Sequence, residues 1–442
     1  FQALAVSLSG RVGTGNIAGV AAAIGFGGPG AVVWMWVVAF LGASTAYFES
    51  TLGQIYKEVD DGQYRGGPAF YFEKALGQKW YGWVFAVLTV FACGVLLPGV
   101  QANAIGNAVD LAVGGGGTLA TPLGEFATAK VVMAGVVTLF LGVIIFGGVK
   151  RIAHFTQVVV PLMALLYILS ALIIIGMNLE AIPGVVSQIV GDAFTPMAGL
   201  GAVIGWGVKR GIYSNEAGQG TGPHAASAAE VEHPAQQGLV QAFSVYVDTL
   251  FVCSATAFMI LITGAYHVTG VEATVSGGAL AATVDPNSPA FTQMAVSQVF
   301  TGFGEPFVAV ALFFFAFTTL LSYYYIAQTN VAYINRTLHI PGIMMMLKVA
   351  LLASAFYGTL RAAGTAWALG DIGVGLMAWL NILGIVLISL AARPAMKALR
   401  DYEAQKKAGA TTYRFDPKAL GIKNAKFWED RLEGKVTDRK SR

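Results

Sequence analysis

The stretch Val12-Gly13-Thr14-Gly15-Asn16-Ile17-Ala18-Gly19 interrupts an apolar segment that covers residues 1 to about 26. Glycine readily leaves the helical conformation, so the two glycines around Thr14 predict a break inside this helix. Backbone groups released at membrane depth are tolerated only where they line a cavity. The freed N–H groups could meet a carboxylate and the freed carbonyls a cation, whereas a plain packing kink is the alternative interpretation.

Apolar runs of about 20 residues recur from this break to the C-terminal region, and each is long enough to cross a bilayer core of about 30 Å. The 442 residues are 56% hydrophobic and only 12% charged, whereas charged residues make up about a quarter of a typical soluble domain. The composition therefore predicts an all-α integral membrane protein. The chain begins without Met inside an apolar segment, so we expect further sequence upstream.

Ten membrane spans are predicted, five in each half of the chain. They cover about 1–26, 30–52, 80–111, 129–146 and 152–177, then 195–229, 234–263, 305–333, 341–357 and 367–390, with short helices near 70–76 and 182–190. The first span of each half is the interrupted one, as expected of inverted repeats whose broken helices meet near the bilayer midplane. We expect repeats at 1–177 and 178–392. No function is predicted for the polar loop at about 266–304.

The distribution of basic residues sets the predicted topology. With the start of the first span in the cytoplasm, Lys57, Arg65, Lys74, Lys79, Lys150, Arg151, Arg336 and the basic tail 393–442 lie inside, and Lys130 and Arg361 lie outside. This satisfies the positive-inside rule. The net charge of +3 is small, and the basic residues indicate topology, not nucleic-acid binding.

The second predicted break lies in residues 209–218, Lys-Arg-Gly-Ile-Tyr-Ser-Asn-Glu-Ala-Gly. Charges within a span are costly, so they face a cavity or pair with one another. Arg210 and Glu216 could form a structural ion pair across an unwound turn. The Asn215 amide, which offers a donor and an acceptor, is the better candidate for direct contact with a polar ligand.

A candidate cation site lies in the span at 305–333. The Phe315 carbonyl and the Thr318 and Thr319 hydroxyls, at i+3 and i+4, share one helix face and could offer three oxygens to a hard cation. Alternatively, the threonines simply bond the backbone carbonyl one turn earlier.

Other polar residues in the spans allow a functional and a structural interpretation. Glu49 and Asp248 are intramembrane or interfacial acids that could couple or gate, or only form packing hydrogen bonds. Tyr323 could form a pocket wall or be an interhelical aromatic. His224 and His233 are expected to be solvated loop residues, and Cys93 and Cys253 to be buried small hydrophobic residues without a metal or redox role.

The chain resembles the alanine or glycine:cation symporter family, the sodium:alanine symporters of bacteria and archaea. The resemblance rests on residues 12–21, 27–31, 34–36, 66–68, 210–218, 233–234, 237–238, 248–249 and 316–319. It implies the leucine-transporter fold, sodium-driven uptake of alanine or glycine, and a site between the first, sixth and eighth spans.

Specific roles are implied by the same resemblance. Thr14, Gly15 and Asn16 would contact the substrate from the first span, and Tyr213 and Asn215 from the sixth. Sodium would lie between backbone carbonyls near Ser9 and Val12 and the oxygens of Phe315, Thr318 and Thr319. The family usually reads Gly-Trp-Ser-Tyr where this chain has Ser322-Tyr323-Tyr324-Tyr325, so Tyr323 stands in place of a pocket-wall tryptophan.

The sequence therefore predicts a secondary active transporter in the cell (inner) membrane. Its expected partners are a small neutral amino acid, co-transported sodium and the lipid bilayer, and a monomer is sufficient. Proton coupling through Glu49 or Asp248 and, in a different class, an ion channel are the alternatives. The spans contain no nucleophile–base pair or metal-ligand cluster, so an enzyme is not expected.

Overall fold

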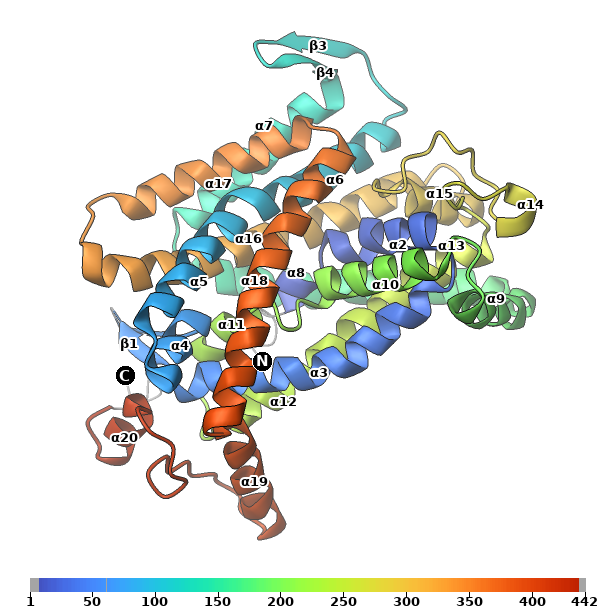
Figure 1. The fold of residues 1–442 in the computed structure, drawn as a ribbon. Helices are drawn as coiled ribbons and strands as arrows, with labels where there is room; N and C mark the ends of the chain where they lie inside the picture. Colours follow the sequence, from blue (N-terminus) through green and yellow to red (C-terminus); the bar gives the residue numbers. More distant parts are fainter. Residues whose placement is uncertain (1–7, 61, 437–442) are drawn as a thin grey trace.

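The computed structural model describes residues 8–60 and 62–436 and confirms a predominantly helical membrane protein (Figure 1). Within these residues, eight helical stretches are long and apolar enough to cross a membrane. They are α3 (Ala31–Ile55), α5 to α6 (Lys79–Phe91 and Leu97–Ala112, joined by the π-helical turn η2, Ala92–Leu96), α7 (Thr128–Ile145), α8 (Val149–Met177), α12 to α13 (Pro234–Tyr246 and Ser254–Ile262, joined by the π-helical turn η4, Val247–Cys253), α16 (Gly304–Leu338), α17 (Ile343–Leu360) and α18 (Ala363–Ala391).

The other two predicted spans are interrupted. In the first, helical residues 8–11 end in a bend at Val12 and Gly13, and a π-helical turn η1 (Gly15–Gly19) leads into α2 (Val20–Gly27). In the second, α10 (Leu200–Asn215) and α11 (Gly222–Ala228) are separated by residues 216–221.

The second break lies further along the chain than predicted, because residues 209–215 remain helical. Glu216, Gly218 and Gly220 have φ angles of 56°, 81° and 82°, a left-handed conformation that favours glycine. Gly207 and Gly211 serve close packing instead. A Cβ at Gly207 would lie 2.5 Å from a backbone oxygen of α3.

Short elements lie between the spans, and the two short helices predicted near 70–76 and 182–190 are present as α4 (Pro68–Leu76) and α9 (Ile182–Phe194). The strands β1 (Glu58–Asp60) and β2 (Gln63–Arg65) pair antiparallel before α4, and β3 (Thr118–Thr121) pairs with β4 (Gly124–Ala127). The 3₁₀ turn η3 (Leu179–Ala181) and α9 precede α10. Figure 1 shows the β3–β4 hairpin at the opposite end of the molecule from the C-terminal helices.

The segment 266–304 is a folded part of the protein, whereas the sequence predicted a long loop. It contains α14 (Ala273–Ser276) and α15 (Ala290–Val299). The Thr269 N–H donates to the Gly25 carbonyl at 2.7 Å, and Trp367 Nε1 donates to the Asn287 carbonyl at 2.8 Å. The segment thus joins the end of α2 to the start of α18.

The helices around the two breaks pack closely on α3. Helices α10, α11 and α12 all contact it, and a Cβ added to Gly42 would lie only 2.8 Å from Ala217. Small residues at such interfaces let membrane helices approach without a hydrophobic driving force between them. Large apolar side chains of α7, α8, α17 and α18, such as Leu139 and Leu172, point outward, as a lipid-facing surface requires.

The C-terminal segment, predicted as a basic tail, packs against the body through α19 (Pro394–Lys407) and α20 (Lys426–Leu432). Trp428 is buried, and its Nε1 donates to the Gln54 carbonyl at 2.9 Å. The ammonium of Lys57 is 4.5 Å from the Phe427 ring centroid and donates to the Ala229 carbonyl at 2.9 Å. This segment therefore covers the end of α3 and the turn after α11.

The expectation that the two histidines are solvated is wrong, because α16 covers one and the C-terminal segment the other. His224 is buried and accepts a hydrogen bond from Asn330 at 2.8 Å. His233 caps α12, since its Nδ1 accepts the Ala235 N–H at 3.1 Å while its Nε2 faces Asp401 at 3.1 Å. Burial lowers the pKa of His233, which keeps the ring neutral and Nδ1 free to accept.

We predict that Trp428→Ala undocks α20. Loss of a buried large aromatic costs about 3–5 kcal/mol, and about 3 kcal/mol raises the open population roughly a hundredfold. Trypsin cleavage at the basic residues of the tail measures this population, provided that reclosing is fast. Trp80→Ala, at a position where the side chain is 65% exposed, should leave the rate unchanged. Equal cleavage of Trp428→Ala and wild type would contradict the prediction.

Candidate functional site

The bend in the first span is held by two side chains that bond its free backbone groups. The Thr14 N–H donates to Gln101 Oε1 at 3.0 Å, and the Gly13 N–H donates to Asn16 Oδ1 at 2.8 Å. A Cβ at Gly13 would lie 2.4 Å from Thr319 Oγ1. Glycine at this position therefore lets the bend approach α16 directly.

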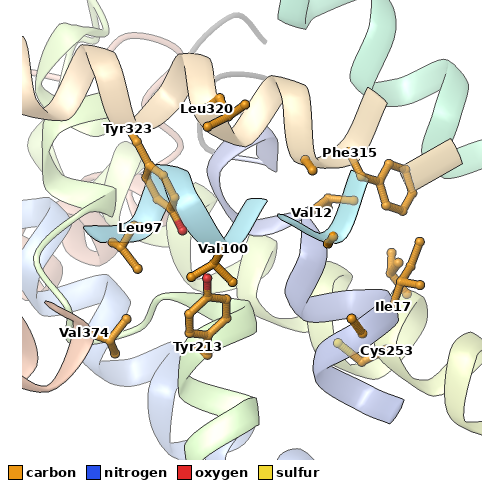
Figure 2. Packing of buried hydrophobic residues seen from close by; sticks show 14 of the residues in the cluster. Val12, Ile17, Leu97, Val100, Tyr213, Cys253, Phe315, Leu320, Tyr323 and Val374 are labelled. Atoms are coloured by element: carbon orange, nitrogen blue, oxygen red, sulfur yellow. The ribbon is translucent and has the colours of Figure 1, made fainter. Parts of the chain in front are cut away.

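Oxygens of the bend and of α16 converge at this approach. Thr319 Oγ1 lies 2.9 Å from the Ser9 carbonyl and 3.0 Å from the Phe315 carbonyl, and Thr318 Oγ1 lies 3.0 Å from the same Phe315 carbonyl. In Figure 2, Val12 and Phe315 lie near each other where the two elements meet. The structure thus brings together all five residues predicted for the cation.

The donor chemistry of this cluster suits a hard cation, because carbonyl and hydroxyl oxygens are the ligands that such ions take. The threonines do bond the carbonyl one turn earlier, as the structural interpretation predicts. Thr319 additionally reaches Ser9 on another helix, which a bond within one helix does not explain. Among the described residues, no group of three or more His, Cys, Asp or Glu side chains could hold a transition metal.

Two tyrosines face the same part of α6 from opposite sides. Figure 2 shows Tyr213 of α10 and Tyr323 of α16 with their hydroxyls directed toward the helix near Val100. Gln101 Nε2, in the next position of α6, donates to the Tyr213 hydroxyl at 3.4 Å. Since Gln101 also holds the Thr14 N–H, this amide joins the first break to α10.

Asn16, a predicted substrate contact, lies beside Asp248, a predicted coupling acid. Asn16 Nδ2 donates to Asp248 Oδ1 at 2.6 Å, and the Ser214 hydroxyl donates to the same oxygen at 3.0 Å. Thr249 Oγ1 donates to the other carboxylate oxygen at 2.8 Å. Cys253 is buried as expected, and its sulfur also accepts from Asn16 at 3.3 Å. This polar cluster joins the first break, α10 and η4.

Gly15 and Asn215 lie at the contact between the two breaks. A Cβ at Gly15 would be 2.9 Å from Ser214 Cα, so the first break packs directly on α10. The Asn215 side chain is engaged locally, because Oδ1 accepts the Ala217 N–H at 3.0 Å and Nδ2 donates to Thr249 Oγ1 at 3.3 Å. Asn215 thus shapes the turn after α10 in this conformation.

Glu49 bonds the backbone of the second break. Its carboxylate oxygens accept the Gly218 N–H at 3.2 Å and the Gly220 N–H at 3.1 Å. Asn381 Nδ2 of α18 donates to the same carboxylate at 2.7 Å and to the Gly218 carbonyl at 3.0 Å. These contacts indicate a structural role for Glu49, because they satisfy N–H groups that have no helical partners in the unwound segment.

The expected Arg210–Glu216 ion pair is wrong. Arg210 pairs with Asp371 of α18 at 3.0 Å and stacks 3.8 Å from the Trp367 ring centroid, whereas Glu216 accepts the Thr221 hydroxyl at 2.9 Å. The two residues are six positions apart and α10 stays helical to Asn215, so at 3.6 residues per turn their side chains leave on different faces.

Four contributing residues were missed by the sequence analysis: Arg11, Gln101, Asp371 and Asn381. Arg11 and Asp371 are charges within apolar segments, so the rule that singled out Arg210 would also have found them. The two amides carry no comparable signal. All four bond to a break or to α10.

The predicted site residues are buried in this conformation. They are Ser9, Val12, Thr14, Gly15, Asn16, Glu49, Arg210, Tyr213, Asn215, Glu216, Asp248, Phe315, Thr318, Thr319 and Tyr323. The structure therefore describes a state in which both breaks and their neighbours are closed to solvent on either side.

Comparison with solved structures places this arrangement in a known fold. The chain is similar to the crystal structure of MhsT in complex with L-phenylalanine, with a TM-score of 0.62 at 16% identity over 88% of each chain. At this identity the likeness shows the fold alone. It is the leucine-transporter fold that the sequence predicted.

Curated relatives match over nearly the whole chain. A putative sodium/proton-dependent alanine carrier of Bacillus subtilis is 57% identical over 97% of this chain and 86% of its own length. A sodium/proton-dependent alanine carrier of Bacillus sp. strain PS3 is 46% identical over 97% and 93%. The profile of the sodium:alanine symporter family matches residues 1–416. The chain belongs to the sodium:alanine symporter family.

Proposed function

We propose that the protein is a sodium-coupled symporter that carries a small neutral amino acid, alanine or glycine, into the cell by alternating access. The observation that carries this proposal is the meeting of the Ser9 carbonyl with Thr319 and Phe315, directly beside the residues 14–16. A cation bound by these oxygens would fix the bend, and the bend presents the groups that we assign to the substrate.

Sodium is the proposed co-transported ion, held by the oxygens of Ser9, Val12, Phe315, Thr318 and Thr319. One sodium charge that crosses a membrane potential of about 100 mV supplies roughly 2.3 kcal/mol. This free energy corresponds to a roughly 50-fold accumulation of the amino acid, before the sodium concentration gradient is included. That is enough for uptake from a dilute medium.

The proposed substrate site is formed by Thr14, Gly15 and Asn16 with Tyr213, Asn215 and Tyr323. Backbone N–H groups at the start of a half-helix favour a carboxylate. Tyr213 and Tyr323 face α6 near Val100 from opposite sides, and Tyr323 has a smaller ring than tryptophan. The relatives named as alanine carriers support a small neutral substrate side chain.

We assign closure of the substrate site on its extracellular side to Arg210. Its ion pair with Asp371 joins α10 to α18, and the Trp367 ring lies 4.6 Å from that of Tyr213. Parting of α10 from α18 would expose Tyr213. We propose that the C-terminal segment lies in the cytoplasm, because the basic loops follow the positive-inside rule, and that the protein lies in the cell (inner) membrane.

Uptake into liposomes tests the proposed function. Reconstituted protein should accumulate labelled alanine or glycine with an inward sodium gradient and not with an equal potassium gradient. Empty liposomes and liposomes with collapsed sodium gradients are the controls. Failure of sodium to stimulate uptake of either amino acid would overturn the proposal.

Thr319→Ala tests the cation site. Removal of one hydroxyl ligand should raise the sodium concentration for half-maximal uptake about tenfold, the equivalent of roughly 1.4 kcal/mol. The preference between alanine and glycine should remain. Thr329→Ala is the matched control, because Thr329 also bonds the carbonyl one turn earlier, that of Tyr325 at 3.0 Å, but on a distant part of α16. An unchanged sodium dependence would place the cation elsewhere.

Proton coupling through Asp248 is the second candidate, since this buried acid contacts Asn16 and Ser214 directly. Asp248→Asn keeps an acceptor oxygen but cannot ionise. We expect it to abolish any uptake driven by a proton gradient while sodium-driven uptake continues. Glu49→Gln is the comparison, and loss of proton-driven uptake in that variant alone would assign the proton to Glu49.

A further inference from the structure

Arg11 is a fully buried cation at the first break, and it bridges that break to the second. It lies between Ser9, whose carbonyl meets Thr319, and the bend at Val12 and Gly13. Its Nε donates to the Asn215 carbonyl at 2.6 Å, across the interface to α10. Buried guanidinium groups are costly and are retained where each donor finds an acceptor.

The same guanidinium also contacts α12 and the start of α11. Nη1 donates to Gln241 Oε1 at 2.8 Å and to the Ser244 hydroxyl. A Cβ at Gly222 would lie 3.0 Å from Nη2, so the group packs against the first residue of α11. Arg11 therefore touches both halves of the second interrupted span and the helix that follows it.

The acceptor at Asn215 is important, because the last carbonyls of a helix have no partner within the helix. A cation at this end of α10 is also favoured by the helix dipole. The last turn of α10 carries Tyr213 and Asn215, so the bond to Arg11 fixes the position of residues that we assign to the substrate.

The charges around Arg11 come from three other elements. The carboxylates of Glu49 on α3, Glu216 in the second break and Asp248 in η4 attract it. The guanidinium also donates hydrogen bonds to the neutral Asn215 carbonyl, Gln241 and Ser244. The position of Arg11 is therefore set by these neutral acceptors as well as by charge.

We propose that Arg11 is a positioning residue that couples the cation site to the substrate site. A cation that orders the carbonyls of Ser9 and Val12 also fixes the residue between them in sequence, and through the Asn215 carbonyl it fixes the end of α10. The inference rests on the proposed sodium-coupled function and adds the route by which one ligand affects the other.

Coupling of this kind is a measurable free energy. If sodium raises the affinity for alanine by some factor, alanine raises the affinity for sodium by the same factor. A residue that only stabilises the fold would change stability or weaken both ligands without altering this factor. A residue that transmits the effect would reduce the factor itself.

The test is the ratio of alanine dissociation constants without and with saturating sodium, measured on purified protein with N-methylglucamine as the replacement cation. Arg11→Gln should lower this ratio at least fivefold relative to wild type. Arg65→Gln is the matched control, because Arg65 is a buried arginine of β2 that pairs with Asp60 of β1 at 2.9 Å and belongs to neither break. It should keep the wild-type ratio.

Arg11→Lys is the second variant if Arg11→Gln does not fold. Lysine keeps the charge but lacks the rigid fork that reaches the Asn215 carbonyl and Gln241 together, so the ratio should fall at least threefold. A wild-type ratio near one would overturn the proposed sodium coupling itself. A large wild-type ratio that persists in a folded Arg11 variant would overturn the role of Arg11.

Discussion

The structure depends on one constraint, that backbone groups released inside a membrane must find partners in the protein. Both breaks meet it with side chains from other helices. Gln101 accepts the Thr14 N–H, Glu49 accepts the N–H groups of Gly218 and Gly220, and Arg11 donates to the Asn215 carbonyl. Both breaks are therefore held by hydrogen bonds. Each is bonded to a neighbouring helix that can move together with the break or separate from it.

The same contacts explain why glycine is placed where it is. Gly218 and Gly220 adopt left-handed conformations with their N–H groups aimed at one carboxylate. Gly13 and Gly15 have a different task, since a Cβ there would collide with Thr319 or Ser214. One group of glycines turns the chain, and the other lets helices approach each other closely.

The sequence predicted the spans well, because apolar length is a local property. The i, i+3, i+4 spacing is also local and placed the oxygens of Phe315, Thr318 and Thr319 together, whereas their binding of a cation stays a prediction. It failed where a partner lies far along the chain. Arg210 pairs with Asp371 and not with the nearby Glu216, and His233 is covered by a C-terminal segment more than 150 positions away, as its contact with Asp401 shows. Such pairings depend on helix packing, which periodicity alone does not specify.

Buried acids lie near the proposed cation ligands and contribute to the electrostatics of the core. The oxygens of Ser9, Phe315, Thr318 and Thr319 are all neutral, so they leave the charge of a bound ion uncompensated. Glu216 lies close by, since a Cβ at Gly10 would be 3.0 Å from its Oε2. Together with Glu49 and Asp248 it surrounds the single guanidinium of Arg11. In a medium of low dielectric constant, each of these acids that is ionised attracts positive charge from a distance, so the oxygens proposed to hold sodium and the acids that would draw it in are different residues.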